Sequence, residues 1–308
     1  MVSSGKILDK KHFPVMLKEV LNLCLPYKNG SFLDCTFGSG GYVKKLLEFP
    51  ESKVSALDRD GETLELAKKI KLKYKSRFSF YHERFSNLDK IFSEEKFNVI
   101  IFDLGISSYQ IDKEHRGFSY TKNGPIDMRM DNTSGNTALE MLKGISRGEL
   151  EKILKEYGEI RNYKKISSSI IQKINEDKFE NTFDLRDAIR EAVTAKNINK
   201  IASQVFQAIR IRLNNEIDIL SKTLDNIPPY INSKGFVAII SFHSLEDRIA
   251  KNFFRTNSKK ISTNKYTKSI QQRNLFRYIT KKPIRPTSEE IENNPRARSA
   301  KLRYGIAN

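Results

Sequence analysis

Short apolar runs separated by amphipathic stretches organise the first hundred residues of the chain. The runs cover residues 31–34, 53–58, 77–85 and 97–105, and residues with helical spacing lie between them. Short apolar runs bounded by turn residues predict buried strands, and a 3.6-residue repeat of apolar positions predicts helices. Alternating strands and helices are typical of a doubly wound α/β sheet, so we expect that fold class here.

The pattern changes after residue 105. Residues 106–200 contain several helical segments but no convincing strand pattern, and a long amphipathic stretch at 204–224 then precedes an apolar strand at 235–242. The loop that leaves a strand in such a sheet is usually only about 2 to 6 residues long. We therefore predict an inserted all-helical domain at 106–200, with residues 1–105 and 201–308 forming one α/β domain.

Three further segments are expected near the chain ends. Residues 12–25 contain a proline followed by helically spaced apolar residues, which predicts a helix. Residues 299–307 alternate between apolar and polar types, which predicts an edge strand that closes the sheet. The polar, low-complexity segment at 257–274 is typical of a mobile loop.

A glycine-rich turn follows the first apolar run. Asp34, Gly38 and Gly40 form the spacing Asp-x-x-x-Gly-x-Gly, and Gly41 begins a helical stretch. Backbone N–H groups at such a turn favour a nucleotide-type ligand, although a purely structural tight turn would use the same glycines. A dinucleotide fingerprint would place its third glycine at position 43, which is Val43. The spacing instead resembles the S-adenosylmethionine loop of class I methyltransferases.

Acidic and aromatic residues stand at the ends of the predicted strands. Asp58 ends the second run, where a carboxylate can accept hydrogen bonds from both hydroxyls of a ribose. The alternative role is a helix N-cap, for which Asp60 is better placed. Because the carboxyl ends of parallel strands meet at one edge of the sheet, we expect Asp34, Phe85 and Asp103 to converge with Asp58 on one crevice.

The composition indicates a cytoplasmic protein without a metal site. No apolar run approaches the ~18 residues of a membrane span, the first residues lack a signal-peptide pattern, and Cys24 and Cys35 lack metal-ligand spacing. The formal net charge is +18, and residues 251–308 hold fifteen Lys and Arg against three Glu. This charge favours a polyanion such as nucleic acid, with a solvated lysine-rich surface as the alternative.

Several short motifs are spread along nearly the whole chain: HFPVMLKEVL, DCTFGSGG, ALDRD, FDLGISS, RGFSY, NGPIDMRMD, YGE, VFQAIRI with LNNE, ISFHSLEDR and NPRARSAKLR. Together they closely resemble the bacterial 16S ribosomal RNA (cytosine-N4) methyltransferases, the MraW family. The resemblance implies a class I methyltransferase (Rossmann-like) sheet with an inserted helical domain that binds substrate. It also implies S-adenosyl-L-methionine as cofactor, 16S rRNA within the small ribosomal subunit as partner, and methylation of the decoding-centre cytosine conventionally numbered 1402. The motifs specify no oligomeric state.

The resemblance also assigns cofactor contacts and shows three departures from the family pattern. Tyr42 stands where the family usually has His, Tyr109 where it has Pro, and Gln204 where it has Arg. The first two positions border the cofactor, so local contacts there are expected to differ, whereas the acidic and glycine positions are intact. The residues placed at cofactor contacts are Gly40, Gly41, Tyr42, Asp58, Phe85, Asp103 and Gln110.

Methylation of an exocyclic cytosine amine is an in-line displacement at a sulfonium methyl, which needs positioning more than acid–base power. An acceptor for the amine N–H groups would favour its nucleophilic form, and Asp103 is a candidate for this catalytic role as well as for cofactor binding. Asp127 and His243 are further catalytic candidates. The alternatives are a salt-bridged loop for IDMRMD and a satisfied polar group at a strand end for His243.

Contacts with RNA are expected from aromatic and basic residues. The target base must leave its stack, and aromatic faces would receive it, although the same aromatic residues are equally suited to the core of the inserted domain. The candidates are Tyr109, Phe118 and Tyr120 for the base, and Arg129, Lys281, Lys282 and Arg285 for the RNA.

Three rival functions follow from the same motifs. A non-enzymatic RNA-binding protein would not need the intact acidic and glycine positions, and a nicotinamide oxidoreductase would need the third glycine. A class I methyltransferase of DNA or of a protein amide is compatible with the core motifs alone. Only the inserted domain and the basic tail favour ribosomal RNA.

Overall fold

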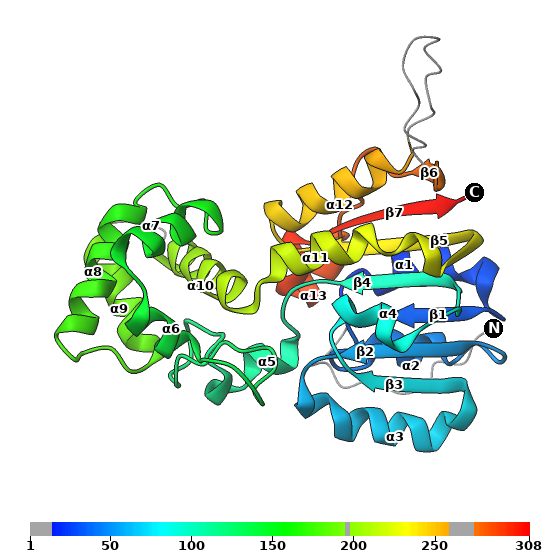
Figure 1. The fold of residues 1–308 in the computed structure, drawn as a ribbon, viewed down its shortest axis with the longest axis horizontal. Coiled ribbons are helices and arrows are strands. Elements are labelled where there is room, and N and C mark those ends of the chain that lie inside the picture. The colour runs from blue at the N-terminus through cyan, green and yellow to red at the C-terminus, as the bar shows by residue number, and fades with distance from the viewer. Residues whose placement is uncertain (1–13, 195–197, 259–273) are drawn as a thin grey trace, which may run out of the picture. The chain divides into compact units, whose positions relative to one another are not determined.

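The computed structural model describes residues 14–194, 198–258 and 274–308 (Figure 1). The chain divides into two compact units, one formed by residues up to 105 together with 219–308 and the other by residues 106–218. The units divide after residues 105 and 218. The helix α10 (Ile198–Asn214) belongs to the second unit because it buries Val205 and Ile209 in the core of that unit.

The described residues of the first unit form a sheet of seven strands in the order β3-β2-β1-β4-β5-β7-β6. The first five strands pair in parallel, and β7 pairs antiparallel with β5 and with β6. This topology confirms the predicted doubly wound class I methyltransferase fold. The strands are β1 (Ser31–Asp34), β2 (Lys53–Asp58), β3 (Phe78–His82), β4 (Phe97–Asp103), β5 (Ile231–Ser241), β6 (Phe276–Ile279) and β7 (Lys301–Ala307).

The prediction of an edge strand at 299–307 was wrong in one respect. β7 forms there, but it lies between β5 and β6, and the edge is β6. The sequence pattern before β6 is polar and gave no strand signal. Most of the predicted loop at 257–274 lies outside the described residues, as do the first two residues of the predicted helix at 12–25.

Helices cover both faces of the sheet, which explains why its strands are continuous apolar runs. Successive residues of each strand point to opposite faces, so Phe32 packs in one core and Leu33 in the other. One face is covered by α1 (Leu17–Cys24), α2 (Gly41–Leu46) and α3 (Leu64–Tyr74), and the other by α4 (Leu88–Ile91), α11 (Glu216–Asp225) and α12 (Ser244–Thr256) (Figure 1). A short helix, α13 (Ser288–Asn293), precedes β7.

The second unit is helical and has its own apolar core, as the sequence predicted. The helices α6 to α10 each contribute apolar residues to this core, and α6, α7 and α9 begin with the capping boxes Thr137–Glu140, Ser146–Glu149 and Asn181–Asp184. The helices are α5 (Ser108–Asp112), α6 (Ala138–Gly144), α7 (Arg147–Glu156), α8 (Tyr163–Asn175), α9 (Thr182–Ala192) and α10.

The long amphipathic stretch at 204–224 forms two helices. α10 ends at Asn214 and α11 begins at Glu216, with Asn215 between them at φ 52°. Asparagine tolerates this left-handed conformation better than most residues, which allows the chain to turn there. The Arg210 guanidinium then pairs with both carboxylate oxygens of Glu216, at 2.8 and 3.0 Å.

Candidate active site

The glycine-rich turn brings backbone close to its neighbours at the carboxyl end of β1. Gly40 has φ 67°, and a Cβ there would lie 3.0 Å from Phe37 and Ile70 side-chain atoms. A Cβ on Gly41 would lie 2.2 Å from Pro14. Gly38 also has a positive φ, of 50°. The turn therefore requires glycine at positions 40 and 41, because neighbouring side chains leave no room for a Cβ atom.

Asp58 fastens the glycine turn to the end of β2. One carboxylate oxygen accepts a hydrogen bond from the Gly38 N–H at 2.7 Å, and the other accepts from the Asp60 N–H at 2.9 Å. Asp60 caps the turn that follows, because its side chain accepts from the Glu62 N–H. Asp58 is therefore not the N-cap, and each of its oxygens keeps a lone pair for a ligand hydroxyl.

Asp34 and Asp103 lie at the ends of the neighbouring strands β1 and β4. Asp34 pairs with Ile101 in the sheet, two residues before Asp103. Thr36 links the two acids: its N–H donates to Asp34 Oδ1 at 3.0 Å, and its hydroxyl oxygen accepts from the Asp103 N–H at 2.7 Å. Among the described residues, Asp34 Oδ2 and Asp103 Oδ1 are buried without a hydrogen-bond partner.

These two carboxyl groups hold protons more tightly than usual. Burial raises the pKa of Asp34 to about 7, and the nearby charge of Asp58 adds to the effect. Burial also raises the pKa of Asp103 well above its usual value, and the charges of Asp34, Glu246 and Glu290 act in the same direction. A cationic ligand group at this place would favour the ionised acids and satisfy their unpartnered oxygens.

Two other predicted cofactor contacts are largely engaged by the protein. The Tyr42 side chain is buried, and its hydroxyl donates a hydrogen bond to the Val15 carbonyl. Phe85 follows β3, and its half-buried ring packs edge to face on Phe102 with 5.6 Å between centroids. The Phe85 ring therefore lies at the same edge of the sheet as Asp103, whereas Tyr42 acts mainly in packing.

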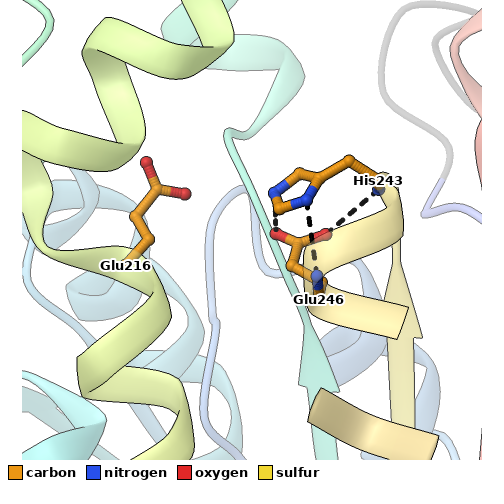
Figure 2. A group of neighbouring side chains, drawn as sticks. All are labelled: Glu216, His243 and Glu246. Atoms are coloured by element: carbon orange, nitrogen blue, oxygen red, sulfur yellow. Dashed lines mark hydrogen bonds and ion pairs between the residues drawn. The ribbon is translucent and has the colours of Figure 1, made fainter. Parts of the chain in front are cut away.

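His243 is the N-cap of α12, and its imidazole is engaged by one residue, Glu246 (Figure 2). Nδ1 accepts from the Glu246 N–H at 3.4 Å, and Nε2 lies 3.1 Å from Glu246 Oε1. An accepting Nδ1 places the proton of a neutral imidazole on Nε2, which is close to Glu246 but makes no hydrogen bond within the described residues. The other carboxylate oxygen of Glu246 accepts from the Phe242 N–H at 2.8 Å. This favours the structural role that the sequence left open for His243.

The loop containing IDMRMD, in the second unit, is held rigid by a salt bridge. The Arg129 guanidinium contacts both oxygens of Asp127, at 2.9 and 2.8 Å, and also donates to the Gly135 carbonyl at 3.0 Å. Asn214 of α10 fixes the same loop, since it accepts from the Met130 N–H at 2.8 Å and donates to the Met128 carbonyl at 2.8 Å. The alternative expected for Asp127 and Arg129, a salt-bridged loop, is what the structure contains.

The aromatic candidates of the second unit differ in their exposure. Phe118 is buried in the core of the unit, which is the structural alternative expected for it. Tyr120 is half-buried and packs on Phe206 with 6.0 Å between ring centroids. Tyr109 is half-buried, and the Lys113 ammonium lies 4.0 Å from its ring centroid. Tyr109 and Tyr120 therefore keep some free surface.

The remaining candidates are a buried amide and three exposed cations. Gln110 forms a capping box with Ser107, in which each side chain accepts from the other's backbone N–H. Lys281, Lys282 and Arg285 are exposed on the segment that follows β6. These cations are accessible to a polyanion.

Sequence reasoning missed Thr36, Glu246 and Glu290. A His-x-x-Glu pair at the start of a helix resembles a capping box, so Glu246 had a local signal. Thr36 and Glu290 had none, because their contacts depend on the sheet order and on distant segments. Glu290 accepts a hydrogen bond from the Met16 N–H at 2.6 Å across 274 positions of sequence.

Comparisons with known proteins agree with this geometry. The MraW methylase family model matches residues 9–306. This chain belongs to the MraW methylase family. Two relatives, both named "Ribosomal RNA small subunit methyltransferase H", are 40% identical. The protein of Rickettsia bellii (strain RML369-C) aligns over 96% of this chain and 98% of its own length, and that of Caldicellulosiruptor saccharolyticus over 95% and 98%.

Membership of this family confirms the resemblance found in the sequence and makes the chain a methyltransferase. One departure from the family pattern has a structural role: Gln204 donates to the Gly158 carbonyl at 3.0 Å and ties α10 to the end of α7. In the part of the chain that the structure describes, no helix is both long and apolar enough to span a bilayer.

Proposed function

We propose that this protein uses S-adenosyl-L-methionine to methylate N4 of a cytosine in 16S rRNA of the small ribosomal subunit. The specific target is the decoding-centre cytosine conventionally numbered 1402. Membership of the MraW family and the names of the relatives support the substrate class. The observation that carries the proposal is the pair of buried acids, Asp34 and Asp103, linked through Thr36 beside the glycine turn. A ribosomal substrate also implies activity in the cytoplasm.

The residues of the first unit fit the proposed cofactor. S-adenosyl-L-methionine supplies a methyl group on a sulfonium and carries a ribose and an ammonium group. Asp58 has lone pairs available for the ribose hydroxyls, and it lies beside the glycine turn, whose Gly38 N–H donates a hydrogen bond to it. The unpartnered oxygens of Asp34 and Asp103 suit the positive charges, because a cation would remove the cost of two buried, unsatisfied acceptors.

Asp103 is the proposed acceptor for the target amine. The cytosine N4 lone pair is delocalised into the ring, and a carboxylate that accepts its N–H hydrogen bonds favours the nucleophilic form. Once methylated, the amine would be cationic and would have one proton to lose. The Asp103 carboxylate, whose pKa is raised by burial, is suited to stabilise that charge and to accept the proton.

The second unit and the C-terminal segment are proposed to hold RNA. Tyr109 and Tyr120 keep partly free aromatic faces on which a base would stack, and the salt-bridged loop of Asp127 and Arg129 would support them. Lys281, Lys282 and Arg285 would contact phosphates. His243 is proposed to act through α12, because its Nδ1 accepts a hydrogen bond from the Glu246 N–H at the start of that helix.

Calorimetry on Asp58→Ala tests the cofactor assignment. Wild-type protein should bind S-adenosyl-L-methionine with micromolar affinity, on the order of −8 kcal/mol. The variant should lose ~1.5 to 3 kcal/mol, or more than tenfold, because a charged acceptor is removed. Asp89→Ala, an exposed carboxylate on α4, is the matched control and should bind normally. Unchanged affinity of Asp58→Ala would disprove the ribose contact.

Mass mapping of methylcytosine tests the substrate assignment. Small-subunit RNA from cells that lack this protein should lose the N4-methyl group at the decoding-centre cytosine and regain it with the wild-type gene. A methyl group that persists without the protein, or one lost from another site, would contradict the proposed target.

A further inference from the structure

The edge strand β6 contains a β-bulge that repositions its side chains. Phe276 pairs with Ala307 and Tyr278 pairs with Ile306, so two steps along β6 match one step along β7. Arg277 is the extra residue. A bulge of this kind changes the direction of the side chains beside it.

The bulge separates a buried aromatic residue from an exposed one. Phe276 is buried, with its ring centroid 5.5 Å from Phe253 and 5.3 Å from Phe254. Tyr278 lies on the opposite face of the sheet and is 48% exposed. Among the described residues, only Leu25, Leu72 and Tyr278 are large apolar side chains with this degree of exposure.

Tyr278 is the exposed end of a row of aromatic rings. Its ring centroid lies 5.6 Å from that of Tyr304, which lies 6.4 Å from Phe236, which lies 5.5 Å from Tyr27. The Tyr278 and Tyr304 rings are inclined by only 35°. The charge of Arg277 acts on Tyr27, where it opposes the rise in pKa that burial causes. Arg277, the neighbour of Tyr278 in β6, is exposed.

A basic segment leads from Tyr278 along the outer side of β7. The Thr280 N–H donates to the Tyr304 carbonyl at 3.0 Å, and Ile284 pairs with Leu302. The segment thus follows β7 over roughly 14 Å, towards Lys301, which pairs with Ser241 at the end of β5. That end of the sheet carries Asp103. The exposed cations along the segment are Lys281, Lys282 and Arg285.

Protection of an edge strand explains only part of this arrangement. Bulges and lysines commonly prevent edge strands from pairing with other chains, which accounts for Arg277 and the cations. It does not account for an exposed tyrosine packed on a second tyrosine. An aromatic face next to guanidinium and ammonium groups is the combination that binds single-stranded nucleic acid, where bases stack and phosphates pair with cations.

We propose that Tyr278, supported by Tyr304 and flanked by Arg277, is a stacking platform for a base in a single-stranded segment of the RNA substrate. The platform lies outside the methyl-transfer site, and Lys281 and Lys282 lead the phosphates from it towards the carboxyl ends of the strands. The inference rests on the proposed RNA substrate and adds a second point of contact with it.

Fluorescence anisotropy with two RNA probes tests the platform. One probe is a single-stranded RNA of about 12 nucleotides and the other is a duplex of equal length, whose bases are not available for stacking. Tyr278→Ala should weaken binding of the single strand by about 5- to 150-fold and leave duplex binding unchanged. Tyr278→Phe keeps the ring and should bind both probes as wild type does. Leu72→Ala, which removes an exposed side chain from α3, is the control for loss of surface area.

The outcomes separate the platform from the proposed function. The platform would be overturned if Tyr278→Ala bound the single strand as tightly as wild type does, or if it bound both probes equally more weakly. In either case, methylation of RNA by the wild-type protein would still uphold the proposed function. Failure of the wild-type protein to bind either RNA would overturn both. A photo-activated cross-link from a 4-thiouridine probe, mapped to Tyr278 by mass spectrometry, would support the platform directly.

Discussion

The two units of this protein differ sharply in charge. The unit built on the sheet has 36 Lys and Arg against 20 Asp and Glu, whereas residues 106–218 have 19 against 17. The helical unit is therefore nearly neutral, although an inserted domain was expected to bind the substrate. For the proposed RNA substrate, the difference predicts that phosphate contacts come mainly from the sheet unit.

Ion-paired acids occur in both units, since Asp247 of the sheet unit pairs with Lys301 and Arg303, but two acids at the strand ends differ from them. In the sheet unit, Asp34 and Asp103 are buried with unpartnered oxygens. Their desolvation raises the free energy of the folded protein, and a cationic ligand would offset that term. In the helical unit, Asp127 is paired with Arg129 and Glu216 with Arg210. Acids of the first kind suit ligand binding and chemistry, and acids of the second kind hold loops and helix ends in place.

The largest expected effect concerns the stability of the sheet unit. The folded pKa of Asp34, about 7, lies above its unfolded value of about 3.9, so its contribution is fully present below pH ~3.9 and is lost as pH rises through 7. Asp34→Asn cannot ionise and should be more stable than wild type by up to roughly 4 kcal/mol at pH 8, with little gain at pH 4. Chemical denaturation at both pH values measures this.

Asp225→Asn, which replaces an exposed carboxylate by the same amide, is the matched control for the Asp34 experiment. If Asp34→Asn raised the free energy of unfolding equally at pH 4 and pH 8, ionisation of the Asp34 carboxyl group would not be the cause.

Asp103→Asn should separate chemistry from cofactor binding. If the carboxylate orients the target amine, turnover at saturating cofactor and RNA should fall by ~10² or more while RNA affinity stays unchanged. Single-turnover kinetics measure the step. Full recovery of the rate at saturating cofactor would limit Asp103 to cofactor binding and leave the amine to the backbone of Leu104 and Gly105 or to Asp127.

Asn214→Ala should destabilise the helical unit alone. The side chain makes three hydrogen bonds, to Met130, Met128 and Arg210, and their loss should cost ~1 to 3 kcal/mol. Hydrogen exchange should accelerate in α6–α10 and stay unchanged in β1–β5. Asn162→Ala, an exposed residue without a capping hydrogen bond, is the control. Equal acceleration in both units would show that they unfold together.

The smallest expected effect is on the salt dependence of RNA affinity, which tests whether the cations of the sheet unit or those of the helical unit contact phosphates. Replacing Lys281, Lys282 and Arg285 by glutamine should reduce the slope of log RNA affinity against log salt by up to about 2, because fewer counterions are released. The matched replacement of three exposed lysines in the helical unit should leave the slope nearly unchanged. These control residues are Lys152, Lys164 and Lys165. The reverse result would place the phosphates on the helical unit.

Much of the fold followed from local sequence patterns. Strands β1, β2, β4 and β5 are apolar runs because both faces of the sheet are covered, and the capping box of Ser146 and Glu149 marked the start of α7. The glycine turn with Asp58 was also visible, since its spacing reflects backbone geometry. β6 was missed because four residues with a bulge carry no periodic signal.

The sequence by itself determined the sheet class, the inserted helices, the family and the acids at the strand ends. Only the tertiary structure decided which acids are unpartnered and which are paired. The sequence placed Asp103 at a strand end and Asp127 in a loop, but only the structure shows that the first has an unpartnered oxygen and that the second is paired with Arg129. The order of the strands places Thr36 between two carboxyl groups, and a bulge exposes Tyr278. Such contacts join residues far apart along the chain, and no local pattern encodes them.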